Sequence, residues 1–454
     1  MTETMIKIHA VGGYNEVGGN MTALQIGEGD DEDVILFDCG LFLPPIVEIE
    51  EKERSYSTDK LRSIGALPDD LVLERKGLTK KVRGILISHA HLDHVGALPY
   101  LAERYNAGIA ATPFTIEVLK SLLDDSGISI RNPLREVHPN SFCTIVGENR
   151  EYKAEFINVT HSTLQATLIA LHTPKGVILY ANDFKFDNSP ILGKKPNYDR
   201  LRELKEEGVL ALIVDSLYAG QEGKTPSEKI ARNLLEDVLL TTENKDACII
   251  VTTFSSHIAR LKSIVEFGQQ LGRKIVFLGR SLRKYVSAAA RLNLAPFIDD
   301  IHMVSYKNET EKILKTIAKN RDKYLIVCTG HQGEPGSILD RLARGVLPFT
   351  FQRKDHVIFS SRVIPTPINI ANRNQLEKKL KERGTRIFAD VHTSGHAYRE
   401  DLRDLITILK PKHIIPAHGD MARLSALAEL ASEEDYELGR NIHIMRNGQT
   451  LNLD

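Results

Sequence analysis

The most informative stretch of this sequence is Gly84-Ile-Leu-Ile-Ser-His-Ala-His-Leu-Asp-His-Val-Gly96. The apolar run at residues 82–87 predicts a buried strand, and the apolar spacing of residues 95–105 predicts a helix. The turn between them carries four potential metal ligands, His89, His91, Asp93 and His94. In extended backbone, side chains two residues apart share a side, so the first three converge and the fourth turns away. A solvated polar loop is the simpler alternative, but the preceding strand favours a metal site that suits two ions better than one.

The overall composition is that of a large globular protein without an obvious charge bias. The 454 residues are long enough for two or three domains, and 42% hydrophobic with 26% charged residues predicts a substantial core. Lys plus Arg number 59 against 60 Asp plus Glu, so net charge gives no argument for a nucleic-acid partner. A local basic face remains compatible with these totals, because steering depends on where the charge lies.

Cysteine usage and the N-terminal sequence predict a cytoplasmic protein. Cys39, Cys143, Cys248 and Cys328 are far apart and form no CxxC pair, which argues against a disulfide framework and a thiolate zinc site. The first residues lack a basic start followed by an apolar stretch, so no signal peptide is expected. No unbroken apolar run reaches the roughly 18 residues of a membrane helix, so we expect no membrane partner.

The first 80 residues predict paired strands followed by an irregular segment. Residues 5–10, 21–27 and 34–37 are expected to be strands. The glycine-rich stretch at 12–20 lacks the Gly-Lys-Ser/Thr ending of a phosphate-binding loop, so a hairpin is favoured. Asp38 ends the third strand and is either a hydrogen-bond acceptor for a ligand histidine or an ordinary strand-end residue. Residues 44–80 predict a long surface loop with some helix.

Two later strands end in further potential ligands. His161 follows an apolar run that begins at Phe156, and Asp183 follows another at residues 177–182. Strand ends are rigid platforms, as a metal site requires. Nitrogen and carboxylate donors are the ligands that zinc and similar ions use when thiolate is absent.

The middle of the chain changes character after the strand at 209–214, which ends in Asp215. From about 226 to 384, helices expected at 226–240 and 257–271 alternate with strands expected at 247–254, 274–278, 324–328 and 356–360. This alternation predicts an inserted domain with a parallel sheet. Its helices carry an excess of positive charge that fits either a polyanion path or a solvated face. The excess comprises Arg260, Lys262, Arg273, Lys274, Arg280, Arg283, Lys284 and Arg291.

The C-terminal part returns to strands that end in histidine. The segment at 386–396 contains His392 and His396, and the segment at 413–420 contains His418. A return of the opening pattern after an insertion predicts one catalytic domain built from both ends of the chain.

These motifs resemble the β-CASP group of the metallo-β-lactamase superfamily, and within it the archaeal type of the ribonuclease J family. The resemblance covers nearly the whole chain and implies an α/β fold. In this fold a metallo-β-lactamase αββα sandwich carries an inserted β-CASP domain, which is a parallel sheet flanked by helices. It is carried by His89-Ala-His-Leu-Asp-His94, His161, Asp183, Asp215, Thr393-Ser-Gly-His396, Pro416-Ala-His-Gly-Asp420 and Gly12-Gly-Tyr-Asn-Glu-Val-Gly-Gly-Asn20. We expect the metallo-β-lactamase domain at 1–217 and 386–454 and the β-CASP domain at 218–385. A chain that ends at Asp454 is expected to have no separate C-terminal domain, which favours the archaeal type.

The resemblance also implies a role for each site residue. One ion is held by His89, His91 and His161, the other by Asp93, His94 and His418, and Asp183 bridges them. Zinc is the expected metal, and manganese suits the same donors. The implied catalytic residues are His396 as proton donor, Asp215, Asp93 and, in an assisting role, His392. The resemblance also implies that His396 contacts phosphate. Further candidate phosphate contacts are Ser394, Gly395, Ser360 and Ser361.

The function implied is a two-metal ribonuclease that degrades single-stranded RNA from a 5′-monophosphate end in the 5′-to-3′ direction, with endonuclease activity left open, in RNA decay and maturation. A polyadenylation-factor-type RNA endonuclease is the alternative, since it shares the chemistry. A hydrolase of small esters, lactones or lactams would need neither the insert nor Asp215 and His396. A non-catalytic RNA-binding member would be expected to lose ligands. A homodimer is left open.

Overall fold

The computed structural model describes residues 4–48 and 56–453. They form two compact units. Unit 1 comprises the described residues up to Asn188, Gly193–Thr225 and the residues from Gly395 onward, and unit 2 comprises Ser189–Leu192 and Pro226–Ser394. The boundaries drawn from the sequence, at 217/218 and 385/386, stay a prediction.

The first sheet of unit 1 has seven strands among the described residues. In spatial order they are β19 (Thr450–Leu453), β1 (Ile6–Gly12), β2 (Met21–Ile26), β3 (Asp33–Phe37), β4 (Val82–Ile87), β5 (Gly108–Ala111) and β6 (Leu134–Glu136). The pairs from β19 to β3 are antiparallel, and those from β3 to β6 are parallel. The strand predicted at residues 82–87 is confirmed as β4, and the hairpin predicted around residues 12–20 is confirmed by the antiparallel pairing of β1 with β2.

The second sheet of unit 1 has six strands in the part of the chain that is described. Its order is β18 (His413–Ala417), β11 (Val209–Asp215), β10 (Gly176–Ala181), β9 (Thr167–Thr173), β8 (Glu151–Asn158) and β7 (Ser141–Val146). The C-terminal segment contributes to both sheets, since β19 pairs with β1 and β18 pairs with β11.

Strand periodicity explains how the two sheets of unit 1 stack. Ile35 and Phe37 of β3 face a core shared with the second sheet, where Ile178 and Tyr180 of β10 lie. The alternate residues of β3 face the opposite way, against helices. Every strand residue of β3 is buried, as two covered faces require.

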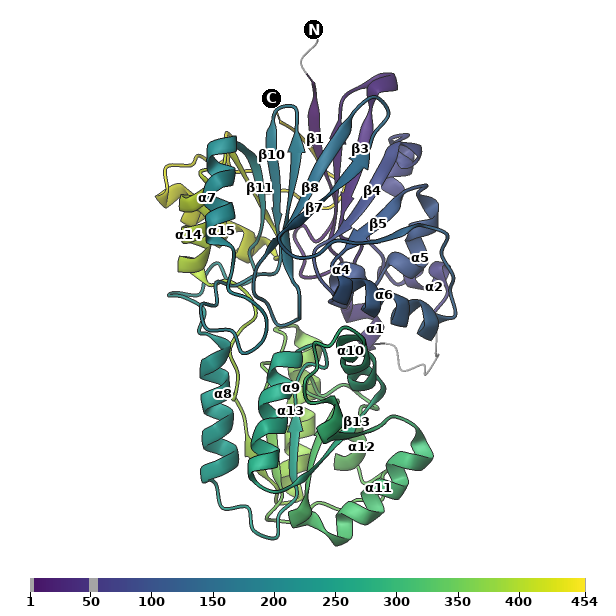
Figure 1. Cartoon of the computed structure of the whole chain (residues 1–454), viewed down its shortest axis with the longest axis vertical. Coiled ribbons are helices and arrows are strands. Elements are labelled where there is room, and N and C mark those ends of the chain that lie inside the picture. Colours follow the sequence, from purple (N-terminus) through teal and green to yellow (C-terminus); the bar gives the residue numbers. More distant parts are fainter. Residues whose placement is uncertain (1–3, 49–55, 454) are drawn as a thin grey trace. The chain divides into compact units, whose positions relative to one another are not determined.

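Helices cover the outer face of each sheet in unit 1. The first sheet is covered by α2 (Thr58–Ser63), α3 (Leu71–Arg75), α5 (Leu98–Leu101) and α6 (Pro113–Ser126). The second is covered by α7 (Tyr198–Glu207), α14 (Arg399–Leu409) and α15 (Met421–Glu433), which lie side by side in Figure 1. Unit 1 is therefore the expected αββα sandwich.

Two local predictions in unit 1 were wrong. The helix expected over 95–105 is broken into α4 (Leu92–Val95), α5 and a 3-10 turn at Ala102–Arg104. Pro99 has no N–H to continue a helix, and the Ala97 N–H donates instead to the Cys39 carbonyl at 2.9 Å. Residues 44–80 are more than a surface loop: besides α1 (Pro44–Glu48), α2 and α3 they place Leu61 and Leu73 in the core. Residues 49–55 of that prediction lie outside the described residues.

Unit 2 is built on one parallel sheet, as predicted. Its order is β14 (Ile301–Val304), β13 (Lys274–Leu278), β15 (Tyr324–Cys328), β12 (Ile249–Thr252), β16 (His356–Phe359) and β17 (Arg386–Phe388). All five pairings are parallel. The helices are α8 (Glu228–Glu236), α9 (Ile258–Gln270), α10 (Arg280–Arg291), α11 (Lys307–Lys319), α12 (Ile338–Ala343) and α13 (Pro367–Glu382). The last three pack on one face of the sheet.

No helix within residues 4–48 and 56–453 is both long and apolar enough to span a bilayer.

Candidate metal centre

Strand ends of both sheets of unit 1 deliver the predicted metal ligands to one place. His89 and His91 follow β4, Asp93 and His94 lie in α4, and the remaining ligands follow strands of the second sheet, namely His161 after β8, Asp183 after β10 and His418 after β18. We call these seven residues the metal cluster. Their ligand atoms fall into overlapping groups, within each of which all atoms lie within 4.8 Å of one another.

The backbone turns sharply where several strands enter the site. Asp38, Asp183 and His418 have φ angles of 58°, 52° and 53°, in the left-handed region that residues other than glycine rarely adopt. Such a conformation costs about 1–3 kcal/mol and persists only where surrounding contacts hold it. Asp38 and His418 directly follow a buried strand, and Asp183 follows one after a single residue, so the turn directs their side chains into the site.

The first ligand group is His89, His91 and His161 with Asp183. His91 Nδ1 lies 3.1 Å from His89 Nε2 and 3.0 Å from His161 Nε2. The two Nε2 atoms lie 3.5 and 3.6 Å from Asp183 Oδ2. His161 Nδ1–H donates to the Gly395 carbonyl at 2.7 Å, so the neutral ring carries its lone pair on Nε2.

Burial keeps this first group neutral. Desolvation, reinforced by neighbouring histidines, lowers the pKa of His91 to about 4 and the pKa values of His89 and His161 well below the usual 6.5. The ring nitrogens therefore face one another as lone pairs. A cation at their centre would satisfy all three.

The second ligand group is Asp93, His94 and His418. His94 Nε2 lies 3.2 Å from Asp183 Oδ2 and 3.6 Å from Asp93 Oδ2, and His418 Nε2 lies 3.6 Å from Asp183 Oδ1. His94 Nδ1 donates to Asp38 Oδ2 at 2.7 Å. Asp38 is thus the acceptor for one of the histidines predicted to be ligands.

Asp183 lies where the two groups meet. Its Oδ1 atom is buried and has no hydrogen-bond partner among the described residues. Burial alone would raise the pKa of Asp183, but His418, His94 and His396 outweigh it and lower that pKa well below its usual range. A buried carboxylate oxygen without a hydrogen bond is costly unless a cation compensates it. The donors therefore fit a divalent metal site.

His396 lies beside the metal cluster and is held by Asp215. Its Nδ1 atom lies 2.8 Å from Asp215 Oδ2, and its Nε2 atom lies 3.9 Å from Asp183 Oδ2. The His396 ring stacks on the His418 ring with centroids 5.7 Å apart. Burial lowers the pKa of His396, but the charges of Asp183 and Asp215 outweigh it and raise the pKa to about 9.

Three features of the site were missed by the sequence reasoning. The Tyr218 ring lies 6.0 Å from the His396 ring, and its position three residues after Asp215 was the available signal. The Gly395 carbonyl orients His161, and a side chain at 395 would lie 3.0 Å from His161 Cε1, so glycine is needed here. Asn20, buried between His94 and His418, had appeared to belong to a hairpin turn.

The remaining predicted residues belong to unit 2, and their roles stay predictions. His392 Nδ1 lies 3.4 Å from Arg260 Nη1, and the Ser360 hydroxyl donates to the Val391 carbonyl at 2.8 Å and accepts from Arg260 Nη1 at 2.8 Å. The Ser361 and Ser394 side chains are also buried. We call Glu228, His257, Arg260, Ser360 and His392 the arginine cluster.

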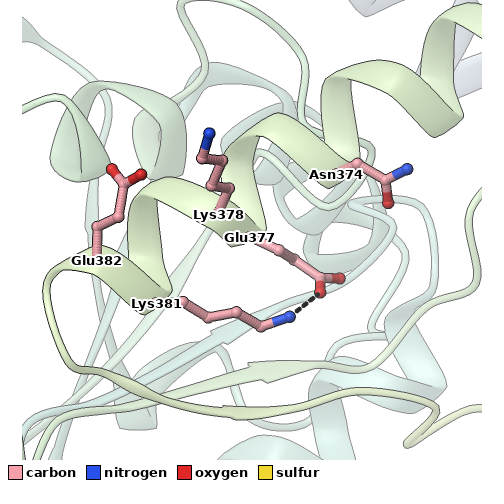
Figure 2. A pocket seen from close by; sticks show the side chains of 5 residues that line it. All are labelled: Asn374, Glu377, Lys378, Lys381 and Glu382. Atoms are coloured by element: carbon pink, nitrogen blue, oxygen red, sulfur yellow. Dashed lines mark ion pairs between the residues drawn. The ribbon is translucent and has the colours of Figure 1, made fainter.

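Unit 2 also has a hollow on the surface of α13, which lacks the character of an active site. Figure 2 shows that Asn374, Glu377, Lys378, Lys381 and Glu382 project from this helix. Lys381 and Glu377 pair with each other at 3.6 Å. These side chains are self-complementary surface groups and do not converge on a common point.

Three family models match the chain. They are the metallo-beta-lactamase superfamily at residues 14–251, the ribonuclease J beta-CASP domain at 246–377 and the Zn-dependent metallo-hydrolase RNA specificity domain at 382–445.

Full-length relatives and a solved structure agree with these matches. The chain is 42% identical to ribonuclease J of Methanocaldococcus jannaschii over 99% of both chains. It is also 42% identical to ribonuclease J of Pyrococcus abyssi, over 99% of this chain and 97% of the relative. A crystal structure of a protein of unknown function from Enterococcus faecalis matches with a TM-score of 0.65 over 99% of this chain and all of that chain. At 18% identity, that structure supports the fold alone.

Proposed function

Because this chain belongs to the ribonuclease J family and is therefore a metal-dependent, RNA-degrading nuclease, we propose that it removes nucleotides from the 5′-monophosphate end of single-stranded RNA. The observation that carries the proposal is the convergence of lone pairs and carboxylate oxygens around Asp183. An endonuclease of the polyadenylation-factor type would share this chemistry and differ in how RNA enters.

Two divalent ions are proposed for each chain, with zinc the expected metal and manganese the alternative. Support comes from the two ligand groups on either side of Asp183, since each offers donors for one ion and both lie within 3.6 Å of an Asp183 oxygen through their histidines. Nitrogen and carboxylate donors suit both metals. When bound, such ions supply Lewis-acid polarisation of the phosphodiester and an activated water.

His396 is proposed as the general acid for the leaving 3′ oxygen. Asp215 binds its Nδ1 atom, which leaves Nε2 directed toward Asp183 at 3.9 Å. This is the arrangement in which a carboxylate orients an imidazole while the other nitrogen handles the proton. Asp215 also accepts from the Leu217 N–H at 2.8 Å, which keeps the carboxylate in place.

Buried hydroxyl groups in unit 2 support a phosphate contact at the 5′ end. Ser361 Oγ and Thr393 Oγ1 have no hydrogen-bond partner within residues 4–48 and 56–453. Each can donate to a phosphate oxygen. The hydroxyl of Ser360 is already bound by protein groups, so Ser361 is the stronger candidate of the pair.

A time course on single-stranded RNA with a labelled 5′ monophosphate tests the direction of cleavage. Metal-loaded enzyme is expected to release labelled mononucleotide at once, without labelled intermediates. The same RNA with a 5′ hydroxyl is the control and should be degraded more slowly. Labelled fragments of discrete lengths at early times would contradict entry from the 5′ end and favour the endonuclease.

The cytoplasm is the proposed compartment. Support comes from the four cysteines, which are all free, as is usual for proteins of a reducing compartment. A homodimer stays a prediction, and size-exclusion chromatography with light scattering tests it.

A further inference from the structure

Asn20 ends the loop between β1 and β2 and is built into the metal centre by its backbone. Its N–H donates to the Asp93 carbonyl at 3.0 Å, and its own carbonyl accepts from the Gly40 N–H at 3.0 Å. The packing is close, since a Cβ atom at Gly40 would lie 1.7 Å from the Asp93 carbonyl oxygen. Asn20 is 1% exposed, so its side chain has only protein groups to contact.

The orientation of the Asn20 amide is fixed by its neighbours. Nδ2 lies 3.0 Å from the Asp93 carbonyl oxygen, which can only accept, and Oδ1 lies 3.1 Å from Asn182 Nδ2, which can only donate. Exchanging the two amide atoms would set the Asn20 oxygen against the Asp93 carbonyl oxygen. Asn20 therefore presents its oxygen on one side and its N–H groups on the other.

This orientation fixes the tautomer of one ligand histidine. His418 Nδ1 lies 3.1 Å from Asn20 Oδ1, so that nitrogen carries the proton and Nε2 carries the lone pair that faces Asp183. The other side of the amide reaches His94, whose Nε2 lies 3.0 Å from Asn20 Nδ2. The amide keeps the Asp93 carbonyl as acceptor when His94 Nε2 serves as a ligand.

The first ligand group is oriented by different residues. His161 Nδ1 is bound by the Gly395 carbonyl at 2.7 Å, and His89 Nδ1 lies 3.0 Å from the Ser88 hydroxyl. The contacts of the Asn20 side chain described above all fall on the second group or on Asn182. A single amide thus connects three residues of the second ligand group that lie up to 398 positions away in the chain.

We propose that Asn20 is the positioning residue of the second metal subsite, and that its loss empties the site formed by Asp93, His94 and His418 while the site formed by His89, His91 and His161 keeps its ion. The inference rests on the proposed two-ion centre. Groups that orient metal ligands typically contribute about 10- to 100-fold to metal affinity.

Metal stoichiometry tests the inference without any activity measurement. Wild-type protein and Asn20→Leu are stripped with a chelator, reloaded with Zn²⁺, desalted and analysed by mass spectrometry for zinc. Leucine has the same branched skeleton of heavy atoms as asparagine and no hydrogen-bonding group in its side chain. The wild type is expected to hold two ions, and the variant one, with affinity for the other lowered roughly 10- to 100-fold.

The matched control is Asn132→Leu. The Asn132 amide donates to the carbonyls of Ala102, Tyr105 and Ala107 at 2.8–3.1 Å, so its loss removes partly buried hydrogen bonds of unit 1 without touching a ligand. This variant should lose thermal stability and keep two ions. Two ions at wild-type affinity in Asn20→Leu would overturn the inference alone, whereas one ion in the wild type would overturn the two-ion proposal and the inference with it.

A second measurement needs no variant and covers the case in which Asn20→Leu does not fold. Long-range ¹H–¹⁵N spectra of zinc-loaded wild type report which nitrogen of each ligand histidine is protonated. His418 is expected to be protonated on Nδ1 and to bind zinc through Nε2. Zinc binding through Nδ1 of His418 would overturn the inference, because Asn20 Oδ1 would then have no proton to accept from that ring.

Discussion

The metal cluster of unit 1 and the arginine cluster of unit 2 have similar composition and different chemistry. Both are largely buried and combine histidine with carboxylate. In the arginine cluster the guanidinium of Arg260 donates to both Glu228 oxygens, at 2.5 and 2.7 Å, and to the Ser360 hydroxyl. In the metal cluster, lone pairs and carboxylate oxygens face one another. The presence of histidine and acid thus says less than whether the cluster contains a permanently charged group such as Arg260.

This difference matters because either cluster would destabilise the folded protein if its buried charges had no partner. A buried carboxylate without a partner loses its hydration and shifts its pKa. Glu228 has a partner within the protein, which makes its cluster complete as a structural unit. Asp183 has histidines on both sides and a buried oxygen without a hydrogen bond from any described residue, which is the state that a metal ion resolves.

The largest effect is expected from Asp183→Asn, which removes the charge shared by both ligand groups. Metal binding and RNA hydrolysis should both be lost. The ions supply several kcal/mol of charge stabilisation, which corresponds to about 10³-fold or more in rate. Zinc analysis and initial rates on single-stranded RNA measure the two losses. Hydrolysis at the wild-type rate in chelator-treated enzyme would contradict a metal-dependent mechanism.

His396→Ala is expected to slow cleavage about 10²- to 10⁴-fold, the usual range for a general acid, with a much smaller change in RNA affinity. His392→Ala is the informative comparison, since its Nδ1 faces Arg260 in the arginine cluster. We expect that variant to slow cleavage less than His396→Ala does. Single-turnover rates with binding measured separately distinguish them, and equal losses in rate and affinity for His396→Ala would make it a binding residue.

Much of the fold and the position of the candidate site followed from local sequence patterns. β4 was predicted with its observed bounds because a buried strand between two covered faces produces a mostly apolar run, here interrupted only by Arg83. The residues after β8, β10 and β18 were singled out for the same reason, and the structure brings them together. The break in the helix expected at 95–105 could also have been predicted from the sequence, since Pro99 lies in the middle of that range.

The missed features depend on contacts between residues that are distant in the chain. Asn20 resembles a turn residue until His418, 398 positions later, lies against it. The burial of Leu61 and Leu73 is masked by the charges, prolines and glycines around them. The Ser360 hydroxyl was a candidate phosphate contact, but Arg260, 100 positions earlier, already binds it. No local pattern encodes these partners.

Arg260→Leu should destabilise the protein by about 3–5 kcal/mol, because it leaves Glu228 as an unpaired buried charge. Chemical denaturation monitored by circular dichroism measures the loss. Zinc content should stay at the wild-type value, since the arginine cluster contributes no residue to the metal cluster. A fall in zinc content in the folded variant would contradict the division between the two clusters.

Low pH should remove the stability that the Glu228 carboxylate of the arginine cluster gives to the folded protein. Burial alone would raise the pKa of Glu228, but Arg260 and His257 outweigh it and lower that pKa well below 4.5. A carboxylate whose pKa is lowered by folding stabilises the native state above its unfolded pKa, and this contribution is lost as pH falls toward the folded value. The stability difference between wild type and Glu228→Gln should therefore be largest near neutral pH and narrow below about 4.5. A constant difference across pH 3–7 would contradict this.

The smallest loss of stability is expected for a pair of arginine and glutamate that lies in solvent. Arg440 Nη1 contacts both Glu437 oxygens at 3.3 Å, with the side chains 76% and 65% exposed. Water screens this pair and already solvates both groups, so Arg440→Gln should cost about 0–1 kcal/mol. Denaturation under the conditions used for Arg260→Leu makes the comparison direct. If Arg440→Gln lost as much stability as Arg260→Leu, burial would not be what separates the two pairs. The argument that the arginine cluster is stabilised by a charge matched inside the protein would then fail.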